Sequence, residues 1–370
     1  MLAGHLEIKE VDEGKYIVNN TITNRFIKLG IREVNYLLSL KGLDVIKGKD
    51  YEPLSSEQEA FLHKKFEEWK FLKEESVQKN KRDLSNIILI SFDSAKWFEK
   101  FMSKFKVIIS PGGLTLLLCL IVFSIYAFYF EAQAILDGVN SFTINFQVLV
   151  MFYLLNFFTG IVHECCHATA CYKYSGKCGK IGIKLFYLLP AYFCDVSNMY
   201  MVKSRKKKVI VSSAGLAANS VIGNLSLFIY IMLYKQGIVF PFLLYSFCYN
   251  IFVIIFNLNP FAKFDGYWIL KAASGIENLY DKRILTFFMM ILTREKLISK
   301  KKCILSLYGS LIFLFHWLFW GYAVYLIYEF IIGKIYFFIA ISIVIILSLI
   351  ALKNCIDFTR KYFRIYKNNY

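Results

Sequence analysis

The sequence predicts a polytopic α-helical membrane protein with a small α+β domain at its N-terminus. Composition is the first observation behind this class. The chain of 370 residues is 57% hydrophobic and 18% aromatic, with a mean hydropathy of +0.48, whereas soluble domains are about 45–50% apolar. The second observation is that six stretches approach or exceed the length of about 20 apolar residues that a membrane-spanning helix needs. They are 107–130, 146–172, 209–233, 239–258, 303–332 and 335–353.

Residues 1–80 are predicted to form the separate α+β domain. Three short β-rich runs are divided by Asp/Gly and Asn/Thr turn signals, and helical spacing follows them. The runs are 5–9, 16–20 and 25–30, and the first helix is expected over 32–40. A second helix is expected over 55–74, with a capping box at its start. The pairs that fit this box are Ser55 with Gln58 and Ser56 with Glu59, and the apolar face comprises Leu62, Phe66 and Trp69.

The remaining boundaries follow from the first and last apolar stretches. Residues 81–106 are predicted to be a linker, and its last part, 94–106, interleaves aromatic residues with lysines as an interfacial helix does. The membrane domain is assigned to 107–354. Residues 355–370 are predicted to be a basic cytoplasmic tail.

The distribution of cations predicts how the spans are oriented. The segments between spans two and three and between spans four and five are rich in lysine and arginine, whereas 131–145 has neither. Because positively charged loops stay in the cytoplasm, both termini are predicted to be cytoplasmic. The first fifty residues are too polar to hold a cleavable signal peptide, which is typical of a bacterial plasma-membrane protein. The net charge of +17 is attributed to cations that flank the spans and contact lipid, so no nucleic-acid partner is expected.

The nine cysteines include no CxxC pair, and most of them fall in spans or on the predicted cytoplasmic side. A structural disulfide framework is therefore not expected. These cysteines are Cys119, Cys165, Cys166, Cys171, Cys178, Cys194, Cys248, Cys303 and Cys355.

The second span contains GIVHECCHATA, residues 160–170, which places three ionisable side chains at membrane depth. On a helix His163 and His167 are four residues apart and project from one face, so both can bind one metal ion. Glu164 lies beside them, where it can take a proton from water. Such five-residue patterns occur by chance in soluble chains, but ionisable groups inside a span are costly and usually functional. The motif therefore predicts a metal site. Cys165 and Cys166 are interpreted as small packing residues on another part of the helix, and the alternative is that one of their thiols lies near the ion.

A catalytic zinc ion usually has three protein ligands and one position for water. NLNPFAKFDGYW, residues 257–268, follows the fourth span on the predicted cytoplasmic side and offers Asp265 as the third ligand. Pro260 ends the helix there, so that the following backbone can turn back toward the bundle. The alternative is that Asp265 is an ordinary turn aspartate before Gly266.

Three elements, in this order, resemble the site-2 protease (M50) family of intramembrane zinc metalloproteases. HECCH matches HExxH, AGLAAN at 214–219 is similar to the family's G-P-x-x-N element, and NLNPFAKFDG matches N-x-x-P-x-x-x-x-D-G. Leu216 replaces the proline of the second element. The resemblance covers a catalytic core at about 145–275. It implies a site-2-protease-like helical core in which Asp265 is the third zinc ligand and Asn219 holds the substrate or its oxyanion. From the residues alone, Asn219 and Asn224 are interpreted as helix–helix hydrogen bonds.

The chain also resembles a branch of peptide zinc metalloproteases linked to maturation of ribosomally synthesised modified peptides. Residues 16–42 look like the winged-helix, PqqD-like domain that binds a leader peptide by adding it as a strand. The alternative is a domain that only steadies the enzyme. The run 180–197 is similar to the branch's loop after the metal helix. Its side chains alternate in character with a period of two residues, which suits an edge strand that holds a substrate in an extended conformation. The resemblance implies a precursor peptide as substrate, and a peptide-modifying enzyme and an ABC exporter as further partners.

Four other polar residues are expected to take no part in metal binding or catalysis. Asp195 is expected to have no catalytic role, and His316 is expected to be a packing or interface residue in an aromatic span. His5 and His63 are predicted to be exposed.

The sequence as a whole predicts a zinc metalloendopeptidase that acts within the membrane on a small precursor peptide. Its Zn²⁺ ligands are His163, His167 and Asp265, with Glu164 as general base and Asn219 polarising the scissile carbonyl. One alternative is regulated intramembrane proteolysis of a transmembrane regulator or a pheromone precursor. An alternative of another class is a non-hydrolytic peptide exporter component or immunity factor.

Overall fold

A computed structural model shows a mostly helical protein with two small antiparallel sheets. It divides into two compact units, residues 1–256 and 257–370, which are described separately below. The structure describes the whole chain except residues 1, 4, 13, 24, 47–52, 73–86, 94–109, 142, 144, 187–188, 277–278, 280–283, 285–299, 332–336 and 370. The interfacial helix predicted over 94–106 lies outside the described residues.

The first sheet has four antiparallel strands in the order β1-β2-β3-β4. These strands are β1 (Leu2–Ala3), β2 (Leu6–Asp12), β3 (Lys15–Asn20) and β4 (Arg25–Gly30). Ile8 pairs with Val18, and Val18 pairs with Ile27. The three predicted β-rich runs are therefore strands, and the short β1 is added to them.

Two helices complete the N-terminal core, α1 (Ile31–Leu40) and α2 (Ser56–Glu68). The capping box of α2 is formed by Ser55 and Gln58, one of the two predicted pairs. Phe66 is fully buried, and Leu62 and Trp69 pack beside it, as the helical spacing predicts. The prediction that His5 is exposed is wrong. Its side chain is only 5% exposed, because its ring contacts the carbonyl oxygen of Phe71 at 3.3 Å.

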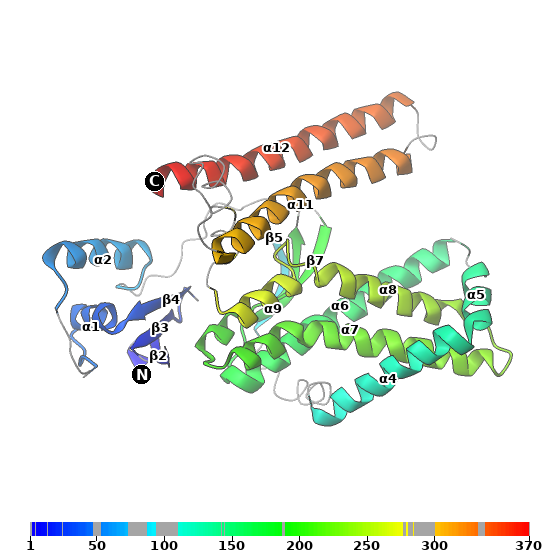
Figure 1. The fold of residues 1–370 in the computed structure, drawn as a ribbon, viewed down its shortest axis with the longest axis horizontal. Helices are drawn as coiled ribbons and strands as arrows, with labels where there is room; N and C mark the ends of the chain where they lie inside the picture. The colour runs from blue at the N-terminus through cyan, green and yellow to red at the C-terminus, as the bar shows by residue number, and fades with distance from the viewer. Residues whose placement is uncertain are drawn as a thin grey trace. The chain divides into compact units, whose positions relative to one another are not determined.

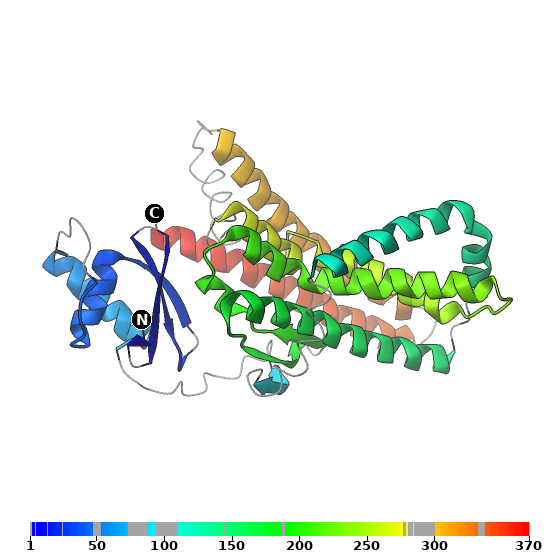
Figure 2. The ribbon, with the colours of Figure 1, turned by 90° about the horizontal axis from the view of Figure 1, so that it is seen from below.

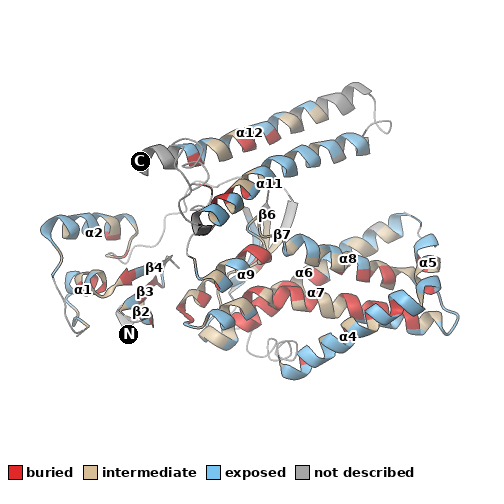
Figure 3. Cartoon of the chain, viewed as in Figure 1, coloured by how far each residue is buried: buried red, intermediate tan, exposed pale blue. Residues whose placement is uncertain are grey.

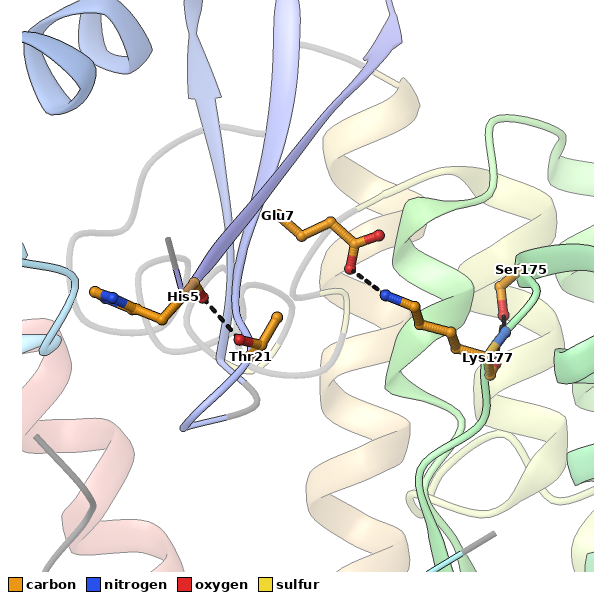
Figure 4. A network of polar contacts seen from close by, with 5 residues as sticks. All are labelled: His5, Glu7, Thr21, Ser175 and Lys177. Atoms are coloured by element: carbon orange, nitrogen blue, oxygen red, sulfur yellow. Dashed lines mark hydrogen bonds and ion pairs between the residues drawn. The ribbon is translucent and has the colours of Figure 1, made fainter. Parts of the chain in front are cut away.

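Strand β3 is buried on both faces. Val18 faces the core that includes α1 and α2, whereas Ile17 packs with Val11 and Met201 in a separate cluster. Met201 belongs to the 3-10 helix η1 (Ser197–Met201). Glu7 on β2 and Lys177, just after α6, form an ion pair of 3.2 Å (Figure 4). The first sheet thus packs against the segments that follow the metal-motif helix.

Four helices in the described residues are long and apolar enough to cross a membrane. They are α4 (Pro111–Phe130), α6 (Phe146–Ser175), α7 (Arg205–Tyr234) and the first part of α11 (Lys300–Ile331), at Cys303–Tyr322. The fourth predicted stretch is the shorter helix α8 (Pro241–Asn257), of 17 residues. The sixth falls in α12 (Phe337–Asn369), partly on residues whose side chains lie outside the description. The membrane class is confirmed at this coarser level, and the six-span count stays a prediction.

Helices α6, α7 and α8 run side by side and are joined by buried polar groups (Figures 1 and 2). Helix α7 has more buried positions than any other helix of the bundle, whereas α4 presents many exposed apolar side chains (Figure 3). On α7, Asn224 accepts a 2.6 Å hydrogen bond from Ser124 on α4, which confirms its prediction as a helix–helix contact. The cation-free segment after α4 contains the helix α5 (Ala132–Asn140), which the sequence interpretation did not include.

The second sheet contains β5 (Ile87–Asp93), β6 (Lys180–Phe186) and β7 (Leu189–Cys194), antiparallel and in this order. The alternation seen in 180–197 therefore corresponds to a hairpin, which directly follows α6. Strand β7 lies against that helix. A Cβ atom on Gly160 would overlap the ring of Tyr192, so only glycine allows this close approach.

The second unit contains α9 (Asp265–Ser274), α11 and α12. Tyr267, Ile312 and Tyr362, from these three helices, pack in one cluster. The Tyr308 hydroxyl donates a 2.6 Å hydrogen bond to the carbonyl of Pro260, which fixes the turn before α9. His316 stacks on Phe358 with ring centroids 3.9 Å apart, in agreement with a packing role.

Candidate metal centre

Helix α6 presents His163 and His167 from one face, as their spacing predicts. Both side chains are buried, at 7% and 6% exposure. Their Nε2 atoms lie 3.2 Å apart. Two nitrogen ligands at about 2.0–2.1 Å from a tetrahedral zinc ion would be separated by roughly 3.3 Å. The spacing of the two nitrogens therefore suits a shared metal ion.

The opposite ring nitrogens fix the tautomers of both histidines. The Nδ1 atom of His163 contacts Oδ1 of Asn219, and the Nδ1 atom of His167 contacts the carbonyl oxygen of Val211 at 2.8 Å. Carbonyl oxygens only accept hydrogen bonds, so each Nδ1 must carry the proton. In a neutral ring the Nε2 atom then carries a lone pair, and the two Nε2 atoms are close enough for these lone pairs to repel each other. A cation between them removes the repulsion, and metal-binding histidines usually have such second hydrogen bonds.

Asn219 belongs to a buried chain of amide groups that connects three helices. Its Nδ2 donates a 2.9 Å hydrogen bond to Oδ1 of Asn250 on α8, and Nδ2 of Asn250 donates to the carbonyl of Ser246 at 2.8 Å. Asn219 is 1% exposed and Asn250 is 0% exposed. In this structure Asn219 orients His163, so it makes the helix–helix contact that its residue type predicts. Its role in binding the substrate stays a prediction.

Gly215 on α7 provides the space beside the two histidines. A Cβ atom at this position would lie equally close to Nε2 of His163 and Nε2 of His167, well inside van der Waals contact. The two rings therefore pack closely against the backbone of α7, and only glycine at this position of the AGLAAN element allows that approach.

Asp265 is the first residue of α9, and it is half-buried. It is followed by Gly266, at which a Cβ atom would overlap the backbone of Leu258. Glycine thus lets the start of α9 pass against the turn at Leu258, which explains why a glycine follows Asp265. The carboxylate stands on the first turn of a helix.

The histidine pair lies in the first unit, and Asp265 begins α9 in the second unit. These are the three side chains that the sequence predicts as ligands. Two imidazoles and a carboxylate are a donor set that suits catalytic zinc. The residues present therefore fit the ion that the sequence predicts, and its binding stays a prediction.

Other residues that the sequence singled out have structural contacts. Glu164 is half-buried on α6 beside the histidine pair. Cys165 and Cys166 are buried, and Cys166 belongs to a core cluster between α6 and α7, as expected of packing residues. Asp195 accepts a 3.0 Å hydrogen bond from the backbone of Ser197, which suits a structural role. His63 is exposed, as predicted.

Asn250 is the residue of this site that the sequence interpretation missed. An asparagine in an otherwise apolar helix is a signal of a polar contact, but the sequence does not specify the helix that provides the partner. Comparison of the chain with known protein families, with curated proteins and with solved structures finds no match.

Proposed function

We propose that the protein is a membrane zinc metallopeptidase that hydrolyses a peptide bond of a small precursor peptide. The observation that carries this proposal is the histidine pair. The Nε2 atoms of both rings lie close together, with the opposite nitrogens held by Asn219 and the Val211 carbonyl. Gly215 allows both rings to approach α7, where any side chain would displace them. Asp265 is proposed as the third ligand.

The chemistry assigned to the individual residues follows from their types and positions. When bound, the ion supplies a Lewis acid that polarises water and the substrate carbonyl. Glu164 is proposed to take the proton of the attacking water and to return it to the leaving amine. Asn219 and the carbonyl of Val211 hold the two imidazoles in the required tautomers. Buried surroundings strengthen each of these interactions, because water does not screen them.

The proposed substrate is a precursor peptide held in an extended conformation. Strand β4 is an edge of the N-terminal sheet, and an edge strand can pair with an added strand. We propose that the N-terminal domain binds the leader of that peptide there. Pairing at the free edge of β4 would not disturb the packing of Ile17 on β3 against Met201.

Zinc content tests the proposed ligands directly. The purified protein is expected to bind about one zinc ion per chain, because its three donors match the catalytic type of site. His167→Ala and Asp265→Ala should each strip the ion during gel filtration. Inductively coupled plasma mass spectrometry of the eluted protein measures the ratio.

His316→Ala is the matched control, since this histidine stacks on Phe358 and is expected to have no part in metal binding. It should keep the wild-type zinc content. Unchanged zinc in Asp265→Ala would show that the third ligand is misassigned while leaving the histidine pair intact. Unchanged zinc in His167→Ala would rule out the site itself.

We also propose that the protein lies in a bacterial plasma membrane with both termini in the cytoplasm. Lys206 and Ser141 are both exposed and lie at opposite ends of the proposed spans. In a cysteine-depleted background, Ser141→Cys should react with an impermeant maleimide in intact cells and Lys206→Cys only after lysis. Rapid labelling at position 206 in intact cells would show that the protein has the opposite orientation in the membrane.

A further inference from the structure

Three thiols lie together at the junction between α6 and the β6–β7 hairpin. Cys171 is in the last turns of α6, Cys178 follows the helix end at Gly176, and Cys194 is the last residue of β7. None of these cysteines belongs to the metal motif. Cys171 is buried, and Cys178 and Cys194 are half-buried.

Cys178 and Cys194 are placed as a disulfide-forming pair. Their Sγ atoms are 3.7 Å apart, against about 2.05 Å in a disulfide. The neighbouring backbone already joins the two segments. The N–H of Gly179 donates to the carbonyl of Asp195 at 2.9 Å, and the N–H of Asp195 donates to the carbonyl of Lys180 at 2.8 Å. Closing the remaining gap therefore needs side-chain rotation and little backbone movement.

Cys171 holds the two segments in this position. Its Sγ contacts the carbonyl oxygens of Lys177 and Val196 at 3.5 and 3.8 Å. Lys177 directly precedes Cys178, and Val196 lies two residues after Cys194. The Ser175 hydroxyl donates to the same Lys177 carbonyl at 2.6 Å, and Figure 4 shows these two residues beside the Glu7 ion pair.

We propose that Cys178 and Cys194 are a reversible dithiol–disulfide site, which low-molecular-weight disulfides such as oxidised glutathione oxidise. This inference does not depend on the proposed peptidase activity. A bond between these residues would tie the end of α6 to the end of β7. Because Tyr192 on β7 packs against Gly160, three residues before His163, the bond would restrain the strand that lies beside the metal motif.

The reaction proceeds by two thiol–disulfide exchanges. The Cys178 thiolate attacks one sulfur of oxidised glutathione, forming a mixed disulfide and releasing one glutathione thiolate. The Cys194 thiolate then attacks the Cys178 sulfur and releases the second glutathione. The two protons lost by the cysteines pass to the two released thiolates. The protein pair is thus oxidised by two electrons, and one disulfide is reduced to two thiols.

The surroundings keep both thiols protonated in the reduced protein. A hydrogen bond to Cys171 lowers the pKa of Cys178, but the hydrogen bond to Cys194 and burial raise it by more. A hydrogen bond to Cys178 lowers the pKa of Cys194, and burial and the charge of Glu164 outweigh this effect. Since the thiolate is the nucleophile, exchange should be faster at mildly alkaline pH.

Peptide mapping of the full-length protein tests the site. Reduced protein is equilibrated with oxidised glutathione at pH 8.5, its remaining thiols are alkylated in denaturant, and it is digested with trypsin. The expected product joins the tryptic peptides 178–180 and 185–203 through a disulfide, and titratable thiols fall from nine per chain to seven. Dithiothreitol should restore all nine.

Cys178→Ser and Cys194→Ser should each abolish the joined peptide, and they should do so without unfolding, because serine has nearly the same size. Cys248→Ser, an exposed cysteine on α8, should leave the joined peptide unchanged. Full alkylation of Cys178 and Cys194 after oxidation, or joining of either one mainly to another cysteine, would overturn the assignment. Zinc content and peptide cleavage by the reduced protein are separate measurements, so failure of the proposed function leaves this test intact.

Discussion

Glu164→Gln is expected to reduce peptide hydrolysis by about a hundredfold or more while zinc content stays at the wild-type level. The substitution keeps the size and hydrogen-bonding capacity of the side chain but removes the base, and a general base contributes roughly 10²–10⁴-fold to rate. The histidines and Asp265 are unchanged. Loss of activity therefore cannot be attributed to loss of the ion, as it can after removal of a histidine.

The measurement is the ratio of uncut to cut peptide, by mass spectrometry, in cells or proteoliposomes that contain the protein and a candidate precursor. Glu329→Gln makes the same change at an exposed glutamate on α11 and should have no effect. Equal processing by Glu164→Gln and wild type would exclude Glu164 as the base. Full export or immunity by this variant, without a cut product in either strain, would instead favour the non-hydrolytic alternative.

The membrane helices and the histidine pair could be predicted because each depends on a local pattern. The thickness of a bilayer sets the length that an apolar stretch needs to span it, and helix geometry places the side chains of residues four apart on the same face. The same reasoning predicted the strands around Ile8 and Val18 and the cap at Ser55. The sequence pattern does not predict helix α5, because its nine residues are too few to appear as an apolar span. Strand β5 was missed because its pairing partner lies in β6, far along the chain.

The supporting contacts of the site could not be predicted in the same way. Asn219 was recognisable as a polar residue in a span, but the sequence does not show that its two ends connect His163 to Asn250. These bonds join residues on three helices, so they depend on how the helices pack. His5 was predicted to be exposed for the same reason, because the carbonyl of Phe71 that covers it comes from the far end of the domain.

Gly215→Ala is expected to abolish zinc binding although it removes no ligand. The added methyl group would overlap the Nε2 atoms of both His163 and His167, so the two rings could not keep the positions from which they would share an ion. Alanine favours helix more than glycine by about 1 kcal/mol, so the helical backbone itself should tolerate the change. The zinc-to-protein ratio should fall from about one to near zero, and circular dichroism should show wild-type helicity.

Gly321→Ala provides the matched control, since this glycine is also inside a helix and a Cβ atom there would meet nothing within 4 Å. It should keep the full zinc content and gain slightly in stability. A Gly215→Ala protein that retains one zinc ion per chain would mean that the ion binds elsewhere or that the two rings separate to admit the methyl group. A crystal or cryo-EM structure of that variant would separate these two cases. A displaced ring would lose its contact with Asn219 or with the Val211 carbonyl, and with it the bond that fixes its tautomer.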